Sequence, residues 1–230
     1  MNEKAALPDH RIGGFFASWS GGKDSCLALY RVIQAGGKPD RLFTMLVENG
    51  DRSHSHGLDK AVLSAQAAAL GVPITFRAAS WEGYEAAFLN GLYEMRNTGT
   101  VAGVFGDIDL AEHLEWVKRV CASAGMAPWE PLWGTKRRRL LAEFVAAGFS
   151  ATVIAIKGDV LHSGFLGRKL DMALVEEFEA LGIDASGELG EYHTVVTDGP
   201  IFSAPIDLEH RKAVFRDGYW FLDVAIAGNA

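Results

Sequence analysis

The sequence predicts an α/β protein with a mostly parallel sheet, because amphipathic helices alternate with short apolar strands along the chain. Apolar residues at helical spacing recur, as at Cys26, Leu29 and Ile33, and each such stretch stops at a glycine. A short apolar run then follows, as at 42–47. This order of elements is typical of βα units, whose strands lie parallel. No repeat of fixed period is present, which argues against a solenoid.

Each element is predicted from its local pattern. The expected strands are Ile12 to Ser18, Leu42 to Val47, Pro73 to Phe76, Val101 to Phe105 and Thr152 to Ile156. The expected helices carry the apolar stripes within 26–33, 62–70, 114–121, 140–145 and 174–181. The run 152–156 is apolar throughout, as expected for a strand covered on both faces by helices. The sequence pattern changes after about Pro128. This change predicts a first domain over 1–127 and a smaller α/β domain over 128–230.

Composition limits the classes of protein that this chain can be. With 230 residues and 49% hydrophobic residues, it can bury a substantial core. No apolar run approaches the roughly 20 residues that a membrane helix needs, and residues 1–11 are polar, unlike a secretory signal. The two cysteines, Cys26 and Cys121, are far apart, which supports neither a disulfide framework nor a cysteine-rich metal site. We therefore expect a cytoplasmic protein without a membrane partner.

Net charge disfavours a nucleic-acid partner. The formal charge is −7, whereas proteins that grip a nucleic-acid backbone usually present a basic face. The one dense basic cluster is 136–139, Lys-Arg-Arg-Arg. It can be the solvated first turn of a helix, or it can hold a phosphate or another anionic group.

The strongest functional signal is the segment Trp19-Ser20-Gly21-Gly22-Lys23-Asp24-Ser25, which joins the first strand to the first helix. Gly21 and Gly22 remove side chains where the backbone must approach a ligand closely. Their N–H groups and those of the new helix converge on one place and create an anion site. Serine hydroxyls add donors and Lys23 adds a positive charge. The pattern is neither the Gly-x-x-x-x-Gly-Lys-Ser/Thr loop nor Gly-x-Gly-x-x-Gly.

This segment resembles the Ser-Gly-Gly-x-Asp-Ser signature of the PP-loop ATP pyrophosphatases. The resemblance implies cleavage of ATP between its α- and β-phosphates and activation of a carboxylate or carbonyl oxygen as an adenylate. ATP and Mg²⁺ are the implied cofactors. The implied ATP-binding residues are Ser18, Ser20, Gly21, Gly22, Lys23, Asp24, Ser25, Leu46 and Gly106.

Several further segments narrow the resemblance. Gly106-Asp107-Ile108 follows a strand, Pro131-Leu132-Trp133 comes later, and Gly187-Glu188-Leu189-Gly190-Glu191-Tyr192-His193-Thr194 precedes Asp198-Gly199-Pro200. In this order with the PP-loop, they resemble the diphthine–ammonia ligase family and its prokaryotic relatives, over about 15–202. That family carries Gly-Glu-Gly-Gly-Glu-Tyr/Phe-Glu-Thr in its C-terminal domain. Here Leu189 stands for a Gly and His193 for a Glu.

The resemblance assigns roles to named positions. Domain 1–127 would bind ATP, and domain 128–230 would bind the substrate. The implied catalytic residues are Lys23, Asp24 and Asp107, and the implied substrate residues are Glu188, Glu191, Tyr192 and Thr194. The two glutamates can instead form a solvated acidic turn. Asp107 can bind Mg²⁺ with phosphates, or it can cap the helix that begins near Leu110.

The segment 51–57 follows the second strand and should lie on the same edge of the sheet. It contains His54 and His56, a spacing that can serve a metal site. His56 can instead contact the substrate or a phosphate, which is the role we assign, or the segment can be a polar loop.

The expected reaction joins a carboxylate, on a small molecule or a protein, to ammonia through an acyl-adenylate, with release of AMP and pyrophosphate. Free ammonia or a separate donor is expected, since the PP-loop domain begins almost at the N-terminus. Two alternatives stand beside this expectation: a PP-loop enzyme that modifies tRNA, and a non-catalytic nucleotide sensor similar to universal stress proteins. A homodimer is compatible with the sequence.

Overall fold

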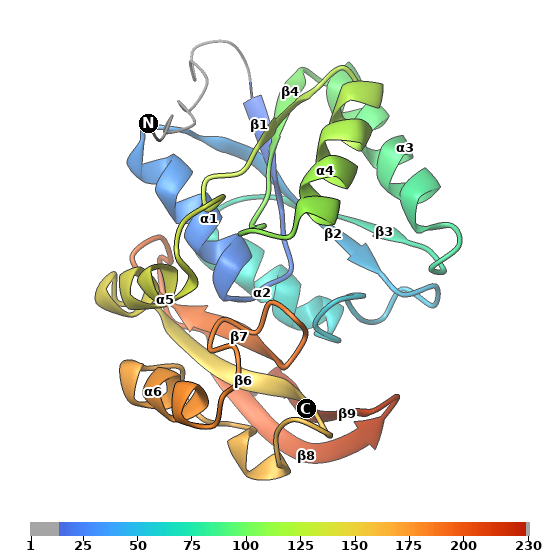
Figure 1. Ribbon diagram of the computed structural model, residues 1–230. Helices are drawn as coiled ribbons and strands as arrows, with labels where there is room; N and C mark the ends of the chain where they lie inside the picture. Colours follow the sequence, from blue (N-terminus) through green and yellow to red (C-terminus); the bar gives the residue numbers. More distant parts are fainter. Residues whose placement is uncertain (1–13, 229–230) are drawn as a thin grey trace. The chain divides into compact units, whose positions relative to one another are not determined.

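The computed structural model describes residues 14–228, which form two compact units (Figure 1). The first unit contains residues up to 20, 24–54 and 72–135; the second contains 21–23, 55–71 and 136 onward. Neither unit is continuous in sequence, so the predicted boundary between residues 127 and 128 stays a prediction. Ile12 and Gly13, the start of the first predicted strand, lie outside the described residues.

The first unit is built on a parallel sheet with strand order β3-β2-β1-β4-β5. Its strands are β1 (Gly14–Ser18), β2 (Pro39–Leu46), β3 (Ile74–Ala78), β4 (Thr100–Val104) and β5 (Ala127–Trp129). Strand order reverses between β1 and β4, because β2 and β3 lie on one side of β1 and β4 and β5 on the other. Ligands of open α/β sheets bind at such a reversal, beyond the carboxyl ends of the strands.

Three helices accompany this sheet: α1 (Lys23–Gln34), α3 (Tyr84–Asn97) and α4 (Ala111–Ser123). Figure 1 shows α3 and α4 together on one face of the sheet and α1 on the other. Beneath α3 and α4 lies a buried cluster that includes Phe16, Phe43, Phe88, Leu92 and Val120.

Helix α3 was not among the predicted helices. Its buried residues Phe88, Leu92 and Met95 do have helical spacing, but Gly91 weakens the helical signal. A side chain at Gly91 would place its Cβ 2.5 Å from the ring of Phe43. Glycine is therefore required here by packing against β2, which the local sequence does not reveal.

The second unit is built on an antiparallel sheet with strand order β7-β6-β9-β8. Its strands are β6 (Ser150–Lys157), β7 (Tyr192–Asp198), β8 (Leu208–Arg216) and β9 (Tyr219–Ile226). The helices are α2 (Lys60–Leu70), α5 (Arg137–Ala146) and α6 (Met172–Ala180), with a short 3-10 turn at Ser163–Phe165. Helices α5 and α6 contact each other, and α2 contacts β9.

The α/β fold class is confirmed, with one correction to the reasoning behind it. The strand predicted at 152–156 exists as part of β6, and its residues Val153, Ile154 and Ile156 are buried as expected. It belongs to the antiparallel sheet, however, and not to a parallel one. A continuous apolar run indicates that both faces of a strand are covered. It does not indicate whether the neighbouring strands are parallel or antiparallel. Strands β8 and β9 were not predicted.

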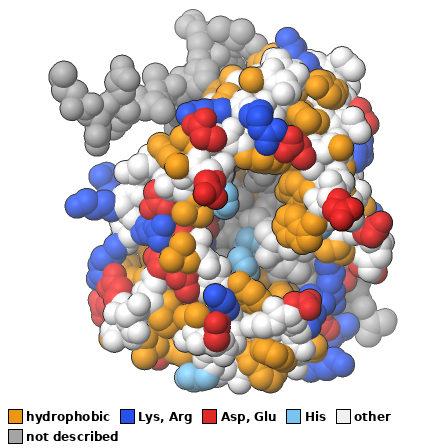
Figure 2. All heavy atoms as spheres, turned by 45° about the vertical axis from the view of Figure 1, so that its right-hand side comes forward, with side chains coloured by type: hydrophobic (Ala, Val, Ile, Leu, Met, Phe, Trp, Pro, Cys, Tyr) orange, Lys and Arg blue, Asp and Glu red, His pale blue; other side chains and the backbone are white. Residues whose placement is uncertain are grey.

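The lengths of the helices and the distribution of charged side chains agree with what the composition suggests. None of the described helices is long and apolar enough to span a membrane. The face drawn in Figure 2 carries acidic and basic side chains interspersed, without a basic stripe. The predicted basic helix turn is present, since α5 begins at Arg137.

Candidate functional site

The glycine-rich segment lies between β1 and α1, at the reversal of strand order in the first sheet. Ser18 is the last residue of β1, and Lys23 is the first residue of α1. The hydroxyls of Ser20 and Ser25 are hydrogen-bonded to each other at 3.1 Å. Asp24 lies in the first turn of α1. The strand, loop and helix that an anion-binding loop requires are therefore all present.

Both loop glycines are needed for steric reasons. Gly21 has a φ of +79°, in the left-handed region that favours glycine. A Cβ on Gly22 would lie 2.4 Å from His56 Nε2 and 3.2 Å from the carbonyl oxygen of Thr194. Any side chain at these positions would displace the loop or its neighbours.

Residues 21–23, the centre of the loop, belong to the second unit and are held by other residues of that unit. The backbone N–H of Lys23 donates to Thr194 Oγ1 at 3.1 Å, and the N–H of Val196 donates to the Gly21 carbonyl at 3.0 Å. The side chain of Gln66 is fully buried and donates to the carbonyls of both Gly21 and Val196, at 2.9 and 2.7 Å. Thr194 thus contacts the loop directly. Gln66 was not predicted as a site residue, because it appears in the sequence only as one polar residue within an apolar helix.

The side chain of Lys23 lies beside aromatic and imidazole rings. Lys23 is 6% exposed, and its Nζ lies 5.4 Å from the centroid of the Tyr192 ring. The rings of His56 and His193 lie 4.6 Å apart, centroid to centroid. Burial, and then the positive charge of Lys23, lowers the pKa of His193 to about 4. The pKa of His56 is also lowered well below its usual value, first by burial and then by His193 and Lys23.

A second group of polar residues follows β4 in the first unit. A Cβ on Gly106 would lie 2.9 Å from backbone atoms of Asp24 and Ser25, so glycine permits the close approach of this loop to α1. Asp107 Oδ1 lies 3.1 Å from His113 Nδ1. The alternative that Asp107 caps the next helix is wrong, because α4 has Leu110 at its N-cap and no side-chain cap.

Glu130 follows β5 and lies close to Asp107. Neither of its carboxylate oxygens has a hydrogen-bond partner among the described residues, and both oxygens are buried. Burial, and then the nearby Asp107 carboxylate, raises the pKa of Glu130 to about 9, although the Asp107 N–H opposes this effect. Burial first, then Asp107, raises the pKa of Tyr84 to about 12. Glu130 was not predicted as a site residue.

These carboxylates fit the chemistry of Mg²⁺, which is commonly held by one or two carboxylates together with phosphates. Asp107 and Glu130 offer hard oxygen ligands, and the two unsatisfied oxygens of Glu130 would be satisfied by a cation. Among residues 14–228, no group of three or more His, Cys, Asp or Glu side chains is placed to hold a metal by itself. Phosphate oxygens would therefore have to complete the coordination.

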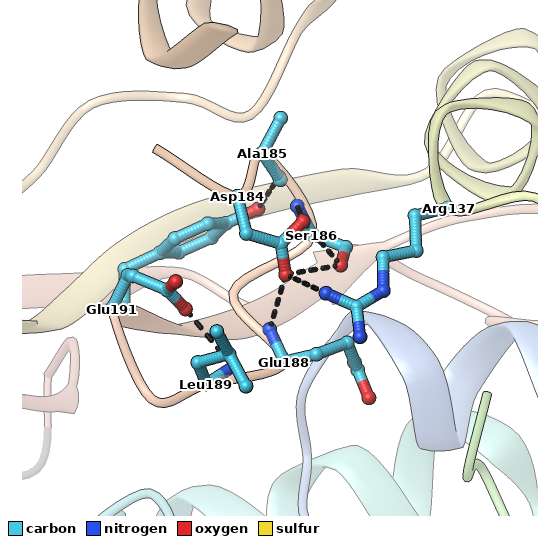
Figure 3. Close-up of polar contacts among 8 residues, drawn as sticks. Arg137, Asp184, Ala185, Ser186, Glu188, Leu189 and Glu191 are labelled. Carbon is cyan, nitrogen blue, oxygen red and sulfur yellow. Dashed lines mark hydrogen bonds and ion pairs between the residues drawn. The ribbon is translucent and has the colours of Figure 1, made fainter. Parts of the chain in front are cut away.

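The predicted substrate segment forms a tight loop in the second unit, drawn in Figure 3. Asp184 organises it: its carboxylate accepts from the N–H and hydroxyl of Ser186 and from the N–H of Glu188, at 2.9 to 3.1 Å. The Arg137 guanidinium donates to the same carboxylate at 2.5 Å. Asp184 was not predicted as a site residue. Its ion pair with Arg137 gives one member of the basic cluster 136–139 a structural role.

The predicted substrate residues of this loop differ in their surroundings. Glu191 is 7% exposed, and its carboxylate accepts the N–H of Leu189 at 3.0 Å, which closes the turn. The hydroxyl of Tyr192 is also engaged, since it donates to the Ala185 carbonyl at 2.7 Å. Glu188 is partly exposed, and its side chain extends away from Asp184 in Figure 3. Glu188 is therefore more accessible to solvent than Glu191.

The two histidines of the His-x-His segment have different surroundings. His54 Nε2 lies 2.7 Å from the Ala79 carbonyl oxygen, and its ring packs on Trp81 and Tyr84. His56 instead lies beside Gly22 and the ring of His193. Leu46, the last residue of β2, is buried beside the carboxyl end of its strand.

Two family models together match nearly all of the chain. Residues 15–128 match the diphthamide synthase N-terminal domain, and residues 136–227 match the diphthamide synthase C-terminal domain. Curated relatives agree. The chain is 27% identical over 235 residues to the diphthine–ammonia ligase of Danio rerio, covering 89% of this chain and 90% of that protein. It is 26% identical over 231 residues to that of Homo sapiens, covering 90% and 86%.

Two solved structures are also similar. One is described as a predicted subunit of tRNA methyltransferase from Methanocaldococcus jannaschii, at 14% identity and a TM-score of 0.44, covering 80% of this chain and 96% of that one. The other is a 4-thiouridine synthetase in complex with RNA and bound ATP, at 14% identity and a TM-score of 0.42, covering 80% and 55%.

Proposed function

This chain belongs to the diphthine–ammonia ligase family, and from that premise we propose that it uses ATP to join a carboxylate to ammonia. ATP attacked at its α-phosphorus by the substrate carboxylate gives an acyl-adenylate and pyrophosphate. Ammonia then attacks the acyl carbon, the bond to AMP breaks, and one proton is released as the amide forms. AMP and pyrophosphate are the products that distinguish this reaction from hydrolysis to ADP.

The observation that supports this proposal most directly is the construction of the loop at 20–25. Its glycines let Gln66 and His56 pack closely against the backbone, which fixes the shape of the loop, and α1 begins within it. Ser20, Gly21, Gly22, Lys23 and Ser25 would surround the β- and γ-phosphates. Fixed N–H dipoles and the Lys23 ammonium would stabilise the charge that develops on the leaving pyrophosphate.

Asp107 would hold Mg²⁺, with Glu130 beside it, and the bound ion would neutralise phosphate charge. Ser18, Leu46 and Gly106 would border the rest of the nucleotide, and Asp24 would support the loop from the first turn of α1. The positions of Ser18 and Leu46 at the carboxyl ends of their strands, and of Gly106 and Asp107 just after β4, support these assignments.

The acceptor would be bound by residues of the second unit. Glu188 has a partly exposed side chain and is the residue that we assign to direct contact with the acceptor. Glu191, Tyr192 and Thr194 would act through the shape of the site: the Glu191 carboxylate closes the turn, the Tyr192 hydroxyl donates to Ala185, and the Thr194 hydroxyl accepts from Lys23. We propose diphthine or another carboxylate as acceptor, ammonia as the nitrogen source, a cytoplasmic location and no nucleic-acid partner.

The proposal is tested with a carboxylate substrate labelled with ¹⁸O. Adenylation transfers one labelled oxygen from the carboxylate to AMP, which mass spectrometry detects. Lys23→Ala should reduce AMP and pyrophosphate formation by about 10²-fold or more, with an unchanged circular dichroism spectrum. Lys118→Ala, at an exposed position on α4, is the matched control. Unlabelled AMP, ADP as the product, or full turnover by Lys23→Ala would overturn the proposal.

A further inference from the structure

Two histidines from distant parts of the chain form a pair beside the glycine-rich loop. His56 precedes α2 and His193 lies in β7, and their ring centroids are 4.6 Å apart. His193 is one of the two positions where this chain departs from the motif of the related family. The reaction described above gives His193 no role, so the pair requires its own explanation.

The pair lies where phosphates are expected to bind. His56 Nε2 occupies the space that a Cβ on Gly22 would enter, at 2.4 Å. Thr194, next to His193, accepts the N–H of Lys23, the first residue of α1. The His56 imidazole therefore lies against the glycine-rich loop, and the His193 ring lies beside it.

The surroundings of the pair keep both rings neutral in the free protein. Burial is the largest cause of the lowered pKa of both histidines; Lys23 lowers both values further, and His193 also lowers that of His56. The ring of Tyr219 on β9 stacks near His193. The guanidinium of Arg216 on β8 lies near Gly57, and the hydroxyl of Ser55 lies 3.2 Å from His56 Nδ1. These named neighbours are neutral or cationic.

A polyphosphate changes this balance. Its negative charge offsets the ammonium of Lys23 and provides oxygens that accept hydrogen bonds from an imidazolium. Nearby opposite charge favours the charged form of a titratable group. A histidine that is neutral in the free protein can then become a donor to the ligand.

We propose that His56 and His193 are phosphate-binding residues that become protonated when the pyrophosphate portion of ATP enters the loop, so that ATP binding takes up protons from solution. This inference rests on the proposed binding of ATP at this loop. Affinity for ATP should then rise as pH falls toward 6, by up to about tenfold per pH unit for each proton taken up.

The test is isothermal titration calorimetry with α,β-methylene ATP, which is not cleaved at the relevant bond. Titrations at one pH in buffers of different ionisation enthalpy give the number of protons taken up. We expect uptake by the native protein and its loss in the double variant His56→Gln/His193→Gln, with weaker binding. His210→Gln, at an exposed position on β8, should retain the native uptake. AMP, which lacks the pyrophosphate portion, should bind without uptake.

The outcomes separate this inference from the proposed function. Binding of the analogue without a difference in proton uptake between the native protein and the double variant overturns the inference and leaves ATP binding intact. Equal uptake with AMP overturns the placement of the pair at the pyrophosphate. No binding of the analogue at all overturns the proposed function, and this inference with it. The single variant His193→Asn, with circular dichroism as the check of folding, covers failure of the double variant to fold.

Discussion

The backbone N–H of Lys23 donates a 3.1 Å hydrogen bond to the hydroxyl oxygen of Thr194, although 171 residues separate the two in sequence. Both residues are buried, so this hydrogen bond gives the N–H an acceptor at a place where little water can reach it. The bond fixes the first residue of α1 against β7.

Thr194→Val should therefore leave a buried N–H without an acceptor. We expect a loss of about 1–3 kcal/mol in the free energy of unfolding and a higher KM for ATP, measured by urea denaturation and by steady-state kinetics. Thr194→Ser retains the hydroxyl and should keep most of the native affinity. Equal KM values for the valine and serine variants would contradict this role.

Gly22→Ala should disable the loop through a steric conflict with His56. The new Cβ would lie 2.4 Å from His56 Nε2, so either the loop or the imidazole must move. We expect loss of AMP formation with retention of the fold. In the double variant Gly22→Ala/His56→Ala, the conflict with the imidazole is absent and nucleotide binding should recover in part.

The matched control for this substitution is Gly83→Ala. Gly83 has a φ of −88°, and the nearest atom to its Cβ position is 3.5 Å away. Alanine should therefore be accommodated there without loss of activity. Similar losses for the two glycine variants would show that close approach at Gly22 is not the cause.

Arg137 and Arg138 are adjacent but should respond very differently to substitution by alanine. Arg137 pairs with the partly buried Asp184, which organises the loop 184–191. Arg138 pairs with Glu179 at the surface, where ion pairs contribute little. Arg137→Ala should lower the thermal midpoint and raise KM for the acceptor, whereas Arg138→Ala should change neither. Differential scanning calorimetry and kinetics with varied acceptor measure both effects.

Asp107→Asn should raise the Mg²⁺ concentration needed for half-maximal activity by about tenfold or more, since it removes a charged oxygen ligand. EDTA should abolish the activity of the native protein. Asp159→Asn, at a side chain that is 73% exposed, is the control. An unchanged Mg²⁺ dependence in Asp107→Asn would exclude Asp107 as a ligand.

The histidine pair should make the nucleotide-free protein sensitive to acid. The folded-state pKa of His193 is about 4, below the ordinary value, so the unfolded chain binds a proton first as pH falls. Stability is fully present above about pH 6.5 and is lost toward pH 4, by up to about 1.4 kcal/mol per pH unit for each histidine. Urea denaturation between pH 7.5 and 4.5 measures this slope, which His56→Gln/His193→Gln should reduce. An unchanged slope in this variant would contradict the assignment.

The parts of the site that local sequence encodes were predictable. The glycine-rich segment and the strand before it are contiguous, so the position of the loop between β1 and α1 and the family could both be inferred from them. Contacts between distant residues could not. Gln66 holds Gly21 and Val196, which lie 45 and 130 residues away from it, and nothing in α2 itself indicates either partner.

The different environments of the acidic residues could not be predicted from the sequence either. Glu188 and Glu191 are indistinguishable in sequence as two acidic residues in a glycine-rich turn. The structure separates them, because Glu191 closes the turn with its own carboxylate. Glu130 likewise acquires its unusual character from the surrounding protein and from Asp107, which lies 23 residues earlier in the chain.

The dependence of Gly21 and Lys23 on β7 has a consequence for biosynthesis. The glycine-rich loop is synthesised early and β7 late. During translation the loop therefore lacks its hydrogen-bond partners at positions 194 and 196 until β7 has been made. Contacts of such long range form slowly, because a long loop of chain must close first. Nascent chains arrested before β7 should therefore lack nucleotide affinity, even when the first sheet has already formed.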